Sequence, residues 1–277
     1  DKGRKRGRAS KGGAEEEEDE DEDEDEDFEL SLQDLLGGLS LDSFLHEFWG
    51  KKVLSTTIEP SLLGKIARGL CDGDLEQIAR KCRKDDNSKF SGQEIEDMES
   101  QLEENRRTVN LPFCFAKSAV ALKQAFIATP GAPASDIEVG VYISRGGGDP
   151  AAWHFDNNHN ITIQVYGSKD WLYTPGPPLA MASRALTDLP HDAVSQSRPI
   201  PSTSRSSPDV RCISLRPGSV LYVPPGHWHS VIPANGARSL AMDLRVATIP
   251  RAKWISEALF AVMALGIRGD SLAGDQE

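Results

Sequence analysis

Two short segments far apart in the chain carry side chains that commonly bind metals, and together they constrain the fold most strongly. The first holds His154 and Asp156 on either side of a phenylalanine, and the second holds His227 and His229 directly after a Pro-Pro-Gly turn. In an extended strand, residues i and i+2 lie on one face, so His154 and Asp156 can bind one ion together. By the same rule His227 and His229 share a face, and either can supply a second imidazole. Two imidazoles and one carboxylate are the facial triad of non-haem Fe(II) sites, so we expect a fold that brings the segments together.

From residue 137 onward, the sequence alternates between short β-prone runs and breaks that contain Gly or Pro. Such spacing is typical of an antiparallel barrel or sandwich. The expected strands are 137–145, 161–166, 170–174, 211–216, 219–223, 228–233 and 238–247. Helical periodicity precedes them, in residues 30–48, 61–81, 91–107 and 118–127. We therefore expect a mainly β protein with a helical N-terminal region.

The first 27 residues are not expected to join a packed core. A basic block at residues 1–11 precedes thirteen consecutive acidic residues, 15–27. These two blocks account for about −8 of the net charge of −12, which leaves about −4 on the rest of the chain. A like-charge run of this length repels itself, so we expect disorder. The basic block resembles a nuclear or nucleolar import signal, and a cytoplasmic location is the alternative. No segment resembles a signal peptide or a membrane span, so no membrane partner is expected.

The residues around these segments resemble the JmjC-type oxygenases that depend on Fe(II) and 2-oxoglutarate. Residues 154–171 are similar to the family's first ligand pair, the apolar strand that follows it and a Gly-x-Lys-x-Trp-like turn. Residues 217–231 resemble the family's Pro-Gly-Asp-x-Leu-Tyr-x-Pro-x-Gly-x-x-His segment, with Ser219 in place of the Asp. Residues 43–54 resemble the N-terminal Phe-x-x-x-x-Trp-x-Lys-Lys-Pro-Leu motif, with Val53 in place of the proline. Within the superfamily, the chain most resembles the cupin-like ribosomal oxygenases, which are protein hydroxylases.

This resemblance implies a double-stranded β-helix core, the cupin or JmjC jelly-roll, flanked by helices. The expected divisions are a tail at 1–27, a helical part at 28–135, the catalytic core at 136–249 and a C-terminal helix and tail at 250–277. Residues 177–208 form a long insertion within the core, which we expect beside the mouth of the site. Ribosomal oxygenases usually continue into a dimerisation bundle and a winged-helix module. We expect neither in the residues after the last strand, unless the sequence is a fragment, and a homodimer stays an open expectation.

The resemblance also implies the metal ligands and the cosubstrate. It places the ligands and the catalytic centre at His154, Asp156 and His229, so that His229 rather than His227 is the third ligand. The metal is then Fe(II), with 2-oxoglutarate and O2 as cosubstrates.

Three further residues are expected at the cosubstrate. Lys169 occupies the position whose ammonium binds the distal carboxylate of 2-oxoglutarate in several JmjC enzymes, and a cation suits a dianionic ligand. A solvent-exposed turn lysine is the alternative for Lys169. Asn160 and Tyr142 are expected to line the same site, with ordinary packing as their alternative.

The function that the resemblance implies is hydroxylation of a protein side chain, a His or Arg of a ribosomal protein. One alternative is N-methyl-lysine demethylation of histones, which would predict histone-reader modules. Another is hydroxylation of a tRNA base, which a basic groove would favour, whereas the folded part is mildly acidic. The non-enzymatic alternative is a cupin-like binding module without a metal, which a broken triad would indicate.

Overall fold

The computed structural model describes the central part of the chain. The described residues are 29–68, 70, 74–85, 88–104, 107–129, 137–175, 207–234, 236, 238–247, 255–256, 259–260 and 262–263. The expected tail at 1–27 and residues 177–206 of the expected insertion lie outside them. The expected C-terminal helix is helical at the positions that are described, 255–256, 259–260 and 262–263.

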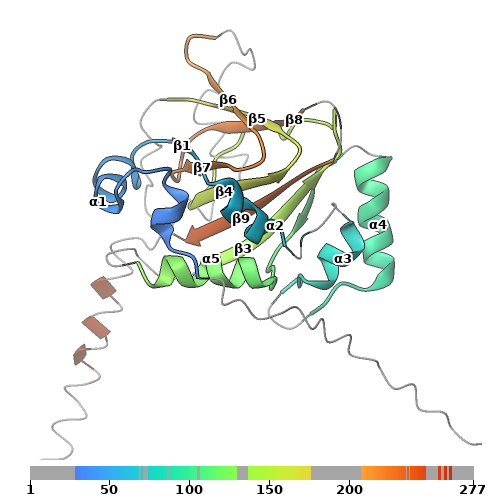
Figure 1. Cartoon of the computed structure of the whole chain (residues 1–277), viewed down its shortest axis with the longest axis horizontal. Coiled ribbons are helices and arrows are strands. Elements are labelled where there is room, and N and C mark those ends of the chain that lie inside the picture. The colour runs from blue at the N-terminus through green and yellow to red at the C-terminus, as the bar shows by residue number, and fades with distance from the viewer. Residues whose placement is uncertain are drawn as a thin grey trace, which may run out of the picture.

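Two antiparallel sheets form the core, and they confirm the expected jelly-roll. The larger sheet has the order β1 (Leu54–Thr57), β7 (Ser219–Val223), β4 (Asn158–Tyr166), β9 (Ser239–Ala247), β3 (Ile137–Ser144) and β2 (Val109–Leu111). The smaller sheet has the order β6 (Arg211–Leu215), β5 (Lys169–Tyr173) and β8 (His229–Pro233). Figure 1 shows the smaller sheet above the larger one, with helix α5 (Lys117–Ile127) below. The strands expected from residue 137 onward are all present, with ends shifted by a few residues.

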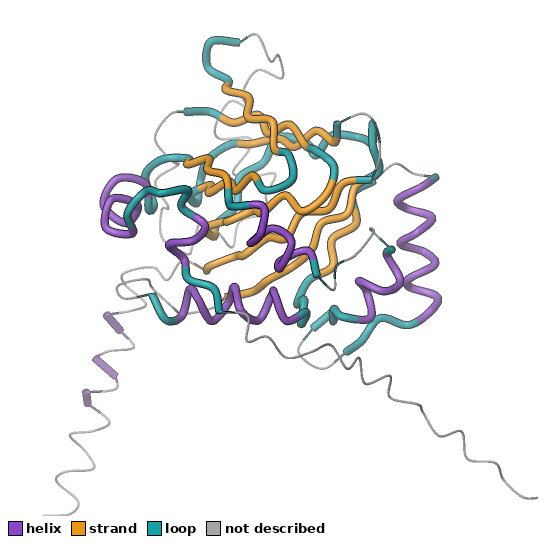
Figure 2. The backbone as a smooth tube through the Cα atoms, in the orientation of Figure 1, coloured by secondary structure: helices purple, strands orange, loops and turns teal. Residues whose placement is uncertain are grey.

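The larger sheet has one apolar and one polar face because side chains alternate along each strand. In β9, Leu240, Met242 and Leu244 join the main hydrophobic core, whereas Asp243 and Arg245 lie on the opposite face. The apolar face continues through Val139, Val141, Ile143, Ile161, Ile163 and Val165. Figure 2 shows helices on one side of the larger sheet and the strands of the smaller sheet on the other. The apolar face packs against the helical layer, so the polar face is left for the interior between the two sheets.

A second, smaller apolar cluster fills part of the space between the sheets. Trp171 and Leu215 from the smaller sheet pack with Leu221 and Val223 of β7. The interior between the sheets is therefore apolar beside β7 and polar along β3, β4 and β9.

The helical part covers the outer face of the larger sheet. Its elements are the 3-10 helix η1 (Leu32–Leu35), α1 (Leu41–Ser43), the π-helical η2 (Phe44–Phe48), α2 (Pro60–Ala67), α3 (Leu75–Arg80), α4 (Gly92–Glu103) and α5 (Lys117–Ile127). Helix α4 begins with a capping box, in which Ser91 and Glu94 satisfy each other's backbone amides. The Asp74 side chain caps α3 by accepting from two backbone amides. None of the described helices is long and apolar enough to cross a membrane.

The helical region differs from the sequence-based expectation in detail. The helix expected at 61–81 is two helices, α2 and α3, and α4 ends at Glu103 rather than at 107. Strands β1 and β2 were not expected, because each is only three or four residues long and lies within a mainly helical region. Both are edge strands of the larger sheet, so tertiary pairing rather than local pattern determines them.

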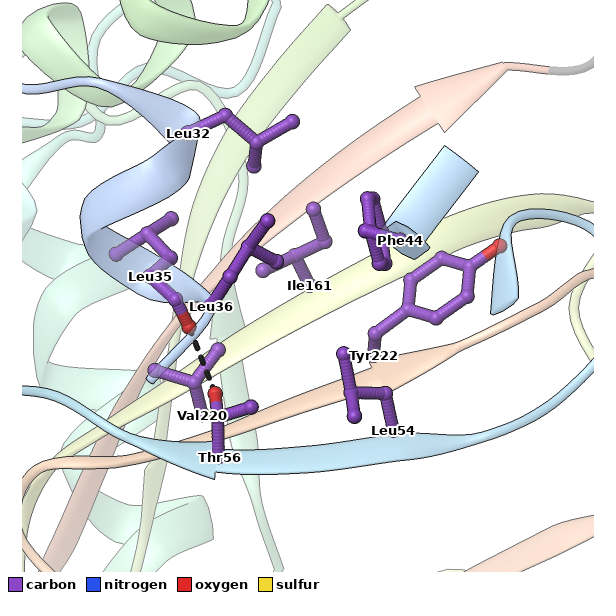
Figure 3. A pocket seen from close by; sticks show the side chains of 9 residues that line it. All are labelled: Leu32, Leu35, Leu36, Phe44, Leu54, Thr56, Ile161, Val220 and Tyr222. Carbon is purple, nitrogen blue, oxygen red and sulfur yellow. Dashed lines mark hydrogen bonds between the residues drawn. The ribbon is translucent and has the colours of Figure 1, made fainter. Parts of the chain in front are cut away.

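The N-terminal leucines attach the first helix to the sheet. Leu32, Leu35 and Leu36 line a small apolar pocket against Ile161 and Val220 (Figure 3). The hydroxyl of Thr56 on β1 donates a 2.7 Å hydrogen bond to the Leu35 carbonyl, which pairs a polar group at the edge of this pocket. Burial of the three leucines holds the start of the described chain on the outer face of the sheet.

An aromatic cluster connects the segment after η2 to β4, the strand that follows Asp156 in the sequence. The His159 ring stacks on Trp49 with ring centroids 3.7 Å apart and an interplanar angle of 7°. The Tyr222 hydroxyl accepts a 2.7 Å hydrogen bond from the Gly50 amide and lies 2.8 Å from His159 Nδ1. Burial lowers the pKa of His159 to about 3, so the imidazole is neutral at physiological pH.

We predict that His159 makes the fold sensitive to acid. A base whose pKa is lower in the folded than in the unfolded state takes up protons on unfolding, so stability falls as the pH drops below the unfolded value of 6.5. Between pH 7 and pH 5 this group should reduce the free energy of unfolding by about 2 kcal/mol. Urea denaturation of wild type and His159→Phe at both pH values measures the difference. Equal losses in the two proteins would contradict the assignment.

Candidate metal centre

The backbones of His154 and His229 are hydrogen-bonded to each other in both directions. The His154 amide donates to the His229 carbonyl at 3.0 Å, and the His229 amide donates to the His154 carbonyl at 2.8 Å. This isolated antiparallel bridge joins the segment before β4 to the first residue of β8. The two imidazoles consequently lie together, with ring centroids 4.2 Å apart. The distant segments identified in the sequence therefore meet.

Asp156 is held beside the two histidines by the Pro-Pro-Gly turn and by Asn160. The Gly226 amide donates a 2.8 Å hydrogen bond to the Asp156 carbonyl, and Gly226 has a φ of 77°, which favours glycine. The side-chain amide of Asn160 donates to Asp156 Oδ2 and orients the carboxylate. The expectation that His154 and Asp156 lie on a regular strand is wrong. Strand β4 begins only at Asn158, and the bridge and the turn position the pair instead.

In both histidines Nδ1 is hydrogen-bonded, which leaves Nε2 as the atom available to a metal. Nδ1 of His154 donates to the Ala152 carbonyl at 2.8 Å, and Nδ1 of His229 donates to the His227 carbonyl at 3.0 Å. A carbonyl can only accept, so Nδ1 carries the proton and Nε2 keeps its lone pair. This second hydrogen bond is the one that fixes the tautomer and ring orientation of histidines that bind metals.

The geometry of the three side chains suits a divalent metal. Their ligand atoms all lie within 4.8 Å of one another, and His229 Nε2 is 3.5 Å from Asp156 Oδ2. Two ligand atoms that lie about 2.1 Å from one ion, at right angles to each other, are about 3 Å apart. The three side chains would therefore have to move only slightly closer together to bind one ion. Burial is the main cause that lowers the pKa of His229 to about 4, and the nearby His154 contributes a smaller lowering. The charge of Asp156 acts in the opposite direction. His229 is thus neutral and available as a ligand at neutral pH.

His227 does not join this group. It lies in the turn before β8, is almost fully buried, and is absent from the cluster that His154, Asp156 and His229 form among the described residues. The expectation that His227 and His229 share a strand face is wrong because β8 begins at His229. The backbone carbonyl of His227 instead holds the Nδ1 proton of His229.

A polar cluster lies next to the candidate metal centre in the interior between the sheets. Lys169, the first residue of β5, is 3% exposed, and its ammonium lies 6.0 Å from the centre of the Tyr142 ring on β3. The alternative of a solvent-exposed lysine at this turn is therefore wrong. Burial lowers the pKa of Lys169 to about 8, and the charge of Asp243 acts in the opposite direction. Burial, together with the nearby Asp243, raises the pKa of the Tyr142 hydroxyl, so it stays protonated as a hydrogen-bond donor.

Two charged residues of this cluster, Asp243 and Arg245, were not recognised from the sequence. Thr162 Oγ1 donates a 2.7 Å hydrogen bond to Asp243, and Arg245 lies 2.6 Å from the Glu138 carboxylate. A Cβ at position 140 would meet the Arg245 guanidinium, so a larger residue there would require the arginine side chain to shift. The signal that could have found them is the alternation of β9, in which two charged residues fall on one face of an otherwise apolar strand.

Comparison with known proteins gives a family match and several distant likenesses. A model of the JmjC domain family matches residues 112–251. The uncharacterized protein YxbC of Bacillus subtilis (strain 168) is 29% identical over 143 residues, which cover 45% of this chain and 41% of YxbC. The structure of E. coli ycfD is 17% identical, with a TM-score of 0.47 over 86% of this chain and 60% of that one. Another structure of YcfD, described as a ribosomal oxygenase from Escherichia coli, is 16% identical, with a TM-score of 0.44 over 86% of this chain and 58% of that one. The matches thus span less than two thirds of the length of these relatives.

We predict that His229, and not His227, is required for metal binding. Removing one of three ligands should weaken the binding of Mn(II), a redox-stable stand-in for Fe(II), by about a hundredfold or more in His229→Ala. In His227→Ala the backbone carbonyl that orients His229 remains, so the affinity should change by less than about tenfold. Titration of each protein followed by electron paramagnetic resonance of free Mn(II) measures both constants. A larger loss in His227→Ala than in His229→Ala would overturn the assignment.

Asn160 is predicted to support the metal site through Asp156. Asn160→Ala removes the donor that orients the carboxylate, and such outer hydrogen bonds are typically worth about 10- to 100-fold in metal affinity. Asn158→Ala is the matched control, because the Asn158 amide donates to Asn160 rather than to the ligand itself. The same Mn(II) titration applies. An unchanged affinity in Asn160→Ala would show that the turn at Gly226 is sufficient to hold Asp156.

Proposed function

The chain belongs to the JmjC domain family, and from this premise we propose that it is a dioxygenase that depends on Fe(II) and 2-oxoglutarate. The observation that supports the proposal most directly is the convergence of His154, Asp156 and His229 with both Nε2 lone pairs directed to one centre. Two imidazoles and one carboxylate on one side of the ion are the ligand set of such enzymes.

In this proposal, each residue at the centre has a defined task. His154, Asp156 and His229 would hold Fe(II), and the remaining coordination positions would receive 2-oxoglutarate and O2. When bound, these groups supply the oxidising chemistry, in which one oxygen atom goes to a substrate C–H bond and the other to succinate, with release of CO2. The protein binds, orients and excludes water. The Trp171 ring, stacked on His229 at 5.2 Å between centroids, limits the movement of that ligand.

The distal carboxylate of 2-oxoglutarate is proposed to bind at Lys169. A cation within a largely buried cluster gains more from an anionic ligand than one in water, because the effective dielectric constant is lower. Lys169 extends from the smaller sheet toward Tyr142 on the larger one, so a ligand at its ammonium lies between the two sheets. Asn160 and the Tyr142 hydroxyl are the further polar groups that we propose for this site.

The substrate class that we propose is a protein side chain, a His or Arg of a ribosomal protein. The support is the likeness of residues 43–54, 154–171 and 217–231 to the motifs of the cupin-like ribosomal oxygenases. The basic block at residues 1–11 suits a nuclear or nucleolar location, which we propose with it.

We predict that Lys169→Met raises the KM for 2-oxoglutarate and leaves metal binding intact. Loss of the ammonium removes the charge that meets the distal carboxylate, so KM should rise by about tenfold or more. The measurement is succinate formation from 2-oxoglutarate in air by Fe(II)-loaded protein without a protein substrate. Lys65→Met, on the exposed side of α2, is the control. The absence of succinate with Fe(II)-loaded wild type would contradict the proposed function itself.

A further inference from the structure

Two cysteines that the proposed reaction does not use lie opposite each other in an isolated antiparallel bridge. Cys82 follows the end of α3, and Cys114 lies between β2 and α5. Both are present as thiols and are buried, with exposed fractions of 1% and 6%. The bridge therefore brings together two thiols that are far apart in the sequence.

The backbone hydrogen bonds at the bridge determine how close the two cysteines are. The Arg83 amide donates to the Phe113 carbonyl at 3.1 Å, and the Phe115 amide donates to the Lys81 carbonyl at 2.8 Å. Because the flanking residues make these bonds, the cysteines are a non-hydrogen-bonded pair, in which the Cα atoms are about 4.5 Å apart and the side chains are closest. A disulfide requires Cα atoms about 4.4–6.8 Å apart, so this backbone can hold one without a large movement.

The two thiols also differ in reactivity. A hydrogen bond between the side chains lowers the pKa of Cys114 against the effect of burial, and it raises the pKa of Cys82. The charge of the nearby Lys81 lowers the pKa of Cys114 as well. The thiolate is the nucleophile in thiol–disulfide exchange, so Cys114 is the thiol that attacks first.

An oxidant reaches this pair through local opening of the bridge. The bridge is isolated, so its two backbone hydrogen bonds are not part of a longer ladder. The neighbouring Phe115 side chain is 51% exposed, which places the segment at the surface. Phe113 has a φ of 48°, which is unfavourable for a bulky side chain, so opening also relieves local strain. Such segments open at a lower free energy than the whole fold.

We propose that Cys82 and Cys114 are an oxidation site at which a low-molecular-weight disulfide, such as oxidised glutathione, forms an intramolecular disulfide. The Cys114 thiolate attacks one sulfur of the small disulfide, whose S–S bond breaks and releases one thiolate. Cys82 then loses its proton and attacks the Cys114 sulfur, which releases the second small thiol. Two protein thiols are oxidised and one small disulfide is reduced to two thiols. This inference does not depend on the proposed function.

The new bond would tie the helical layer to the larger sheet. The Cys114 amide already donates a 2.6 Å hydrogen bond to the Val139 carbonyl on β3, so a bond to Cys82 connects α3 covalently to this part of the sheet. A disulfide stabilises a fold by restricting the unfolded chain, and the effect grows with the length of the loop that it closes. Oxidation should therefore raise the melting temperature by about 5–10 °C.

The test is incubation of the full, folded chain with oxidised glutathione, followed by alkylation of the remaining thiols and peptide mapping by mass spectrometry without reduction. We expect a peptide pair linked through Cys82 and Cys114 that separates on reduction. Thermal unfolding of the oxidised and reduced forms of the same protein then measures the shift in melting temperature.

Two variants serve as matched controls. Cys212→Ser removes an exposed cysteine on β6 and should keep both the linked peptides and the shift. Cys82→Ser should lose both, and it should retain a glutathione adduct on Cys114 because no second thiol resolves it. Each shift compares two forms of one protein, so any destabilisation by the substitution itself cancels. If Cys82→Ser does not fold, the peptide map of wild type decides alone.

Three results would overturn the inference. The first is complete modification of Cys212 by glutathione while no bond forms between Cys82 and Cys114. The second is a lasting glutathione adduct on Cys114 in wild type, which would mean that Cys82 cannot reach it. The third is a disulfide that forms but lowers the melting temperature, which would mean that the folded backbone does not accommodate the bond.

Discussion

The reciprocal backbone hydrogen bonds between His154 and His229 are the interaction on which the rest of the site depends. They join the segment before β4 of the larger sheet to the first residue of β8 in the smaller sheet, and so determine where the two imidazoles lie. The other site contacts build on this bridge: the Gly226 amide holds Asp156, and the His227 carbonyl orients His229. Backbone groups make these contacts, and the Asn160 side chain adds a hydrogen bond to the Asp156 carboxylate.

A polar interior is compatible with a stable fold because the main hydrophobic core lies elsewhere. The outer face of the larger sheet packs against helices and N-terminal leucines, and this layer contains most of the fully buried apolar side chains. The inner face can therefore carry Thr162, Asp243 and Arg245, and Lys169 can lie opposite them on the smaller sheet, which a single central core would not accommodate without cost. Because the core on the outer face stabilises the fold, the residues between the two sheets can be polar.

Much of the fold and of the candidate site could be predicted from the sequence, and the reasons differ between elements. The β strands after residue 137 follow from alternation and from Gly and Pro breaks, and the meeting of His154, Asp156 and His229 follows from motif resemblance. The irregular path at His154 could not be read from a period-two rule, because the bridge to His229 exists only in the folded chain. Strands β1 and β2 were missed since their pairing is long-range. Asp243 was missed because charged residues on one face of a strand usually mark an exposed face, whereas in the folded chain the second sheet covers this face and buries Asp243.

The measurement that tests the central claim most directly is the visible absorption of anaerobic Fe(II)-loaded protein on addition of 2-oxoglutarate. A 2-oxo acid that chelates Fe(II) through its carboxylate and keto oxygens gives a charge-transfer band in the visible range, and it requires two adjacent open positions on the ion. The account predicts a band that needs both Fe(II) and 2-oxoglutarate and is lost in Asp156→Ala. Fe(II) bound at this centre with no band at saturating 2-oxoglutarate would contradict it.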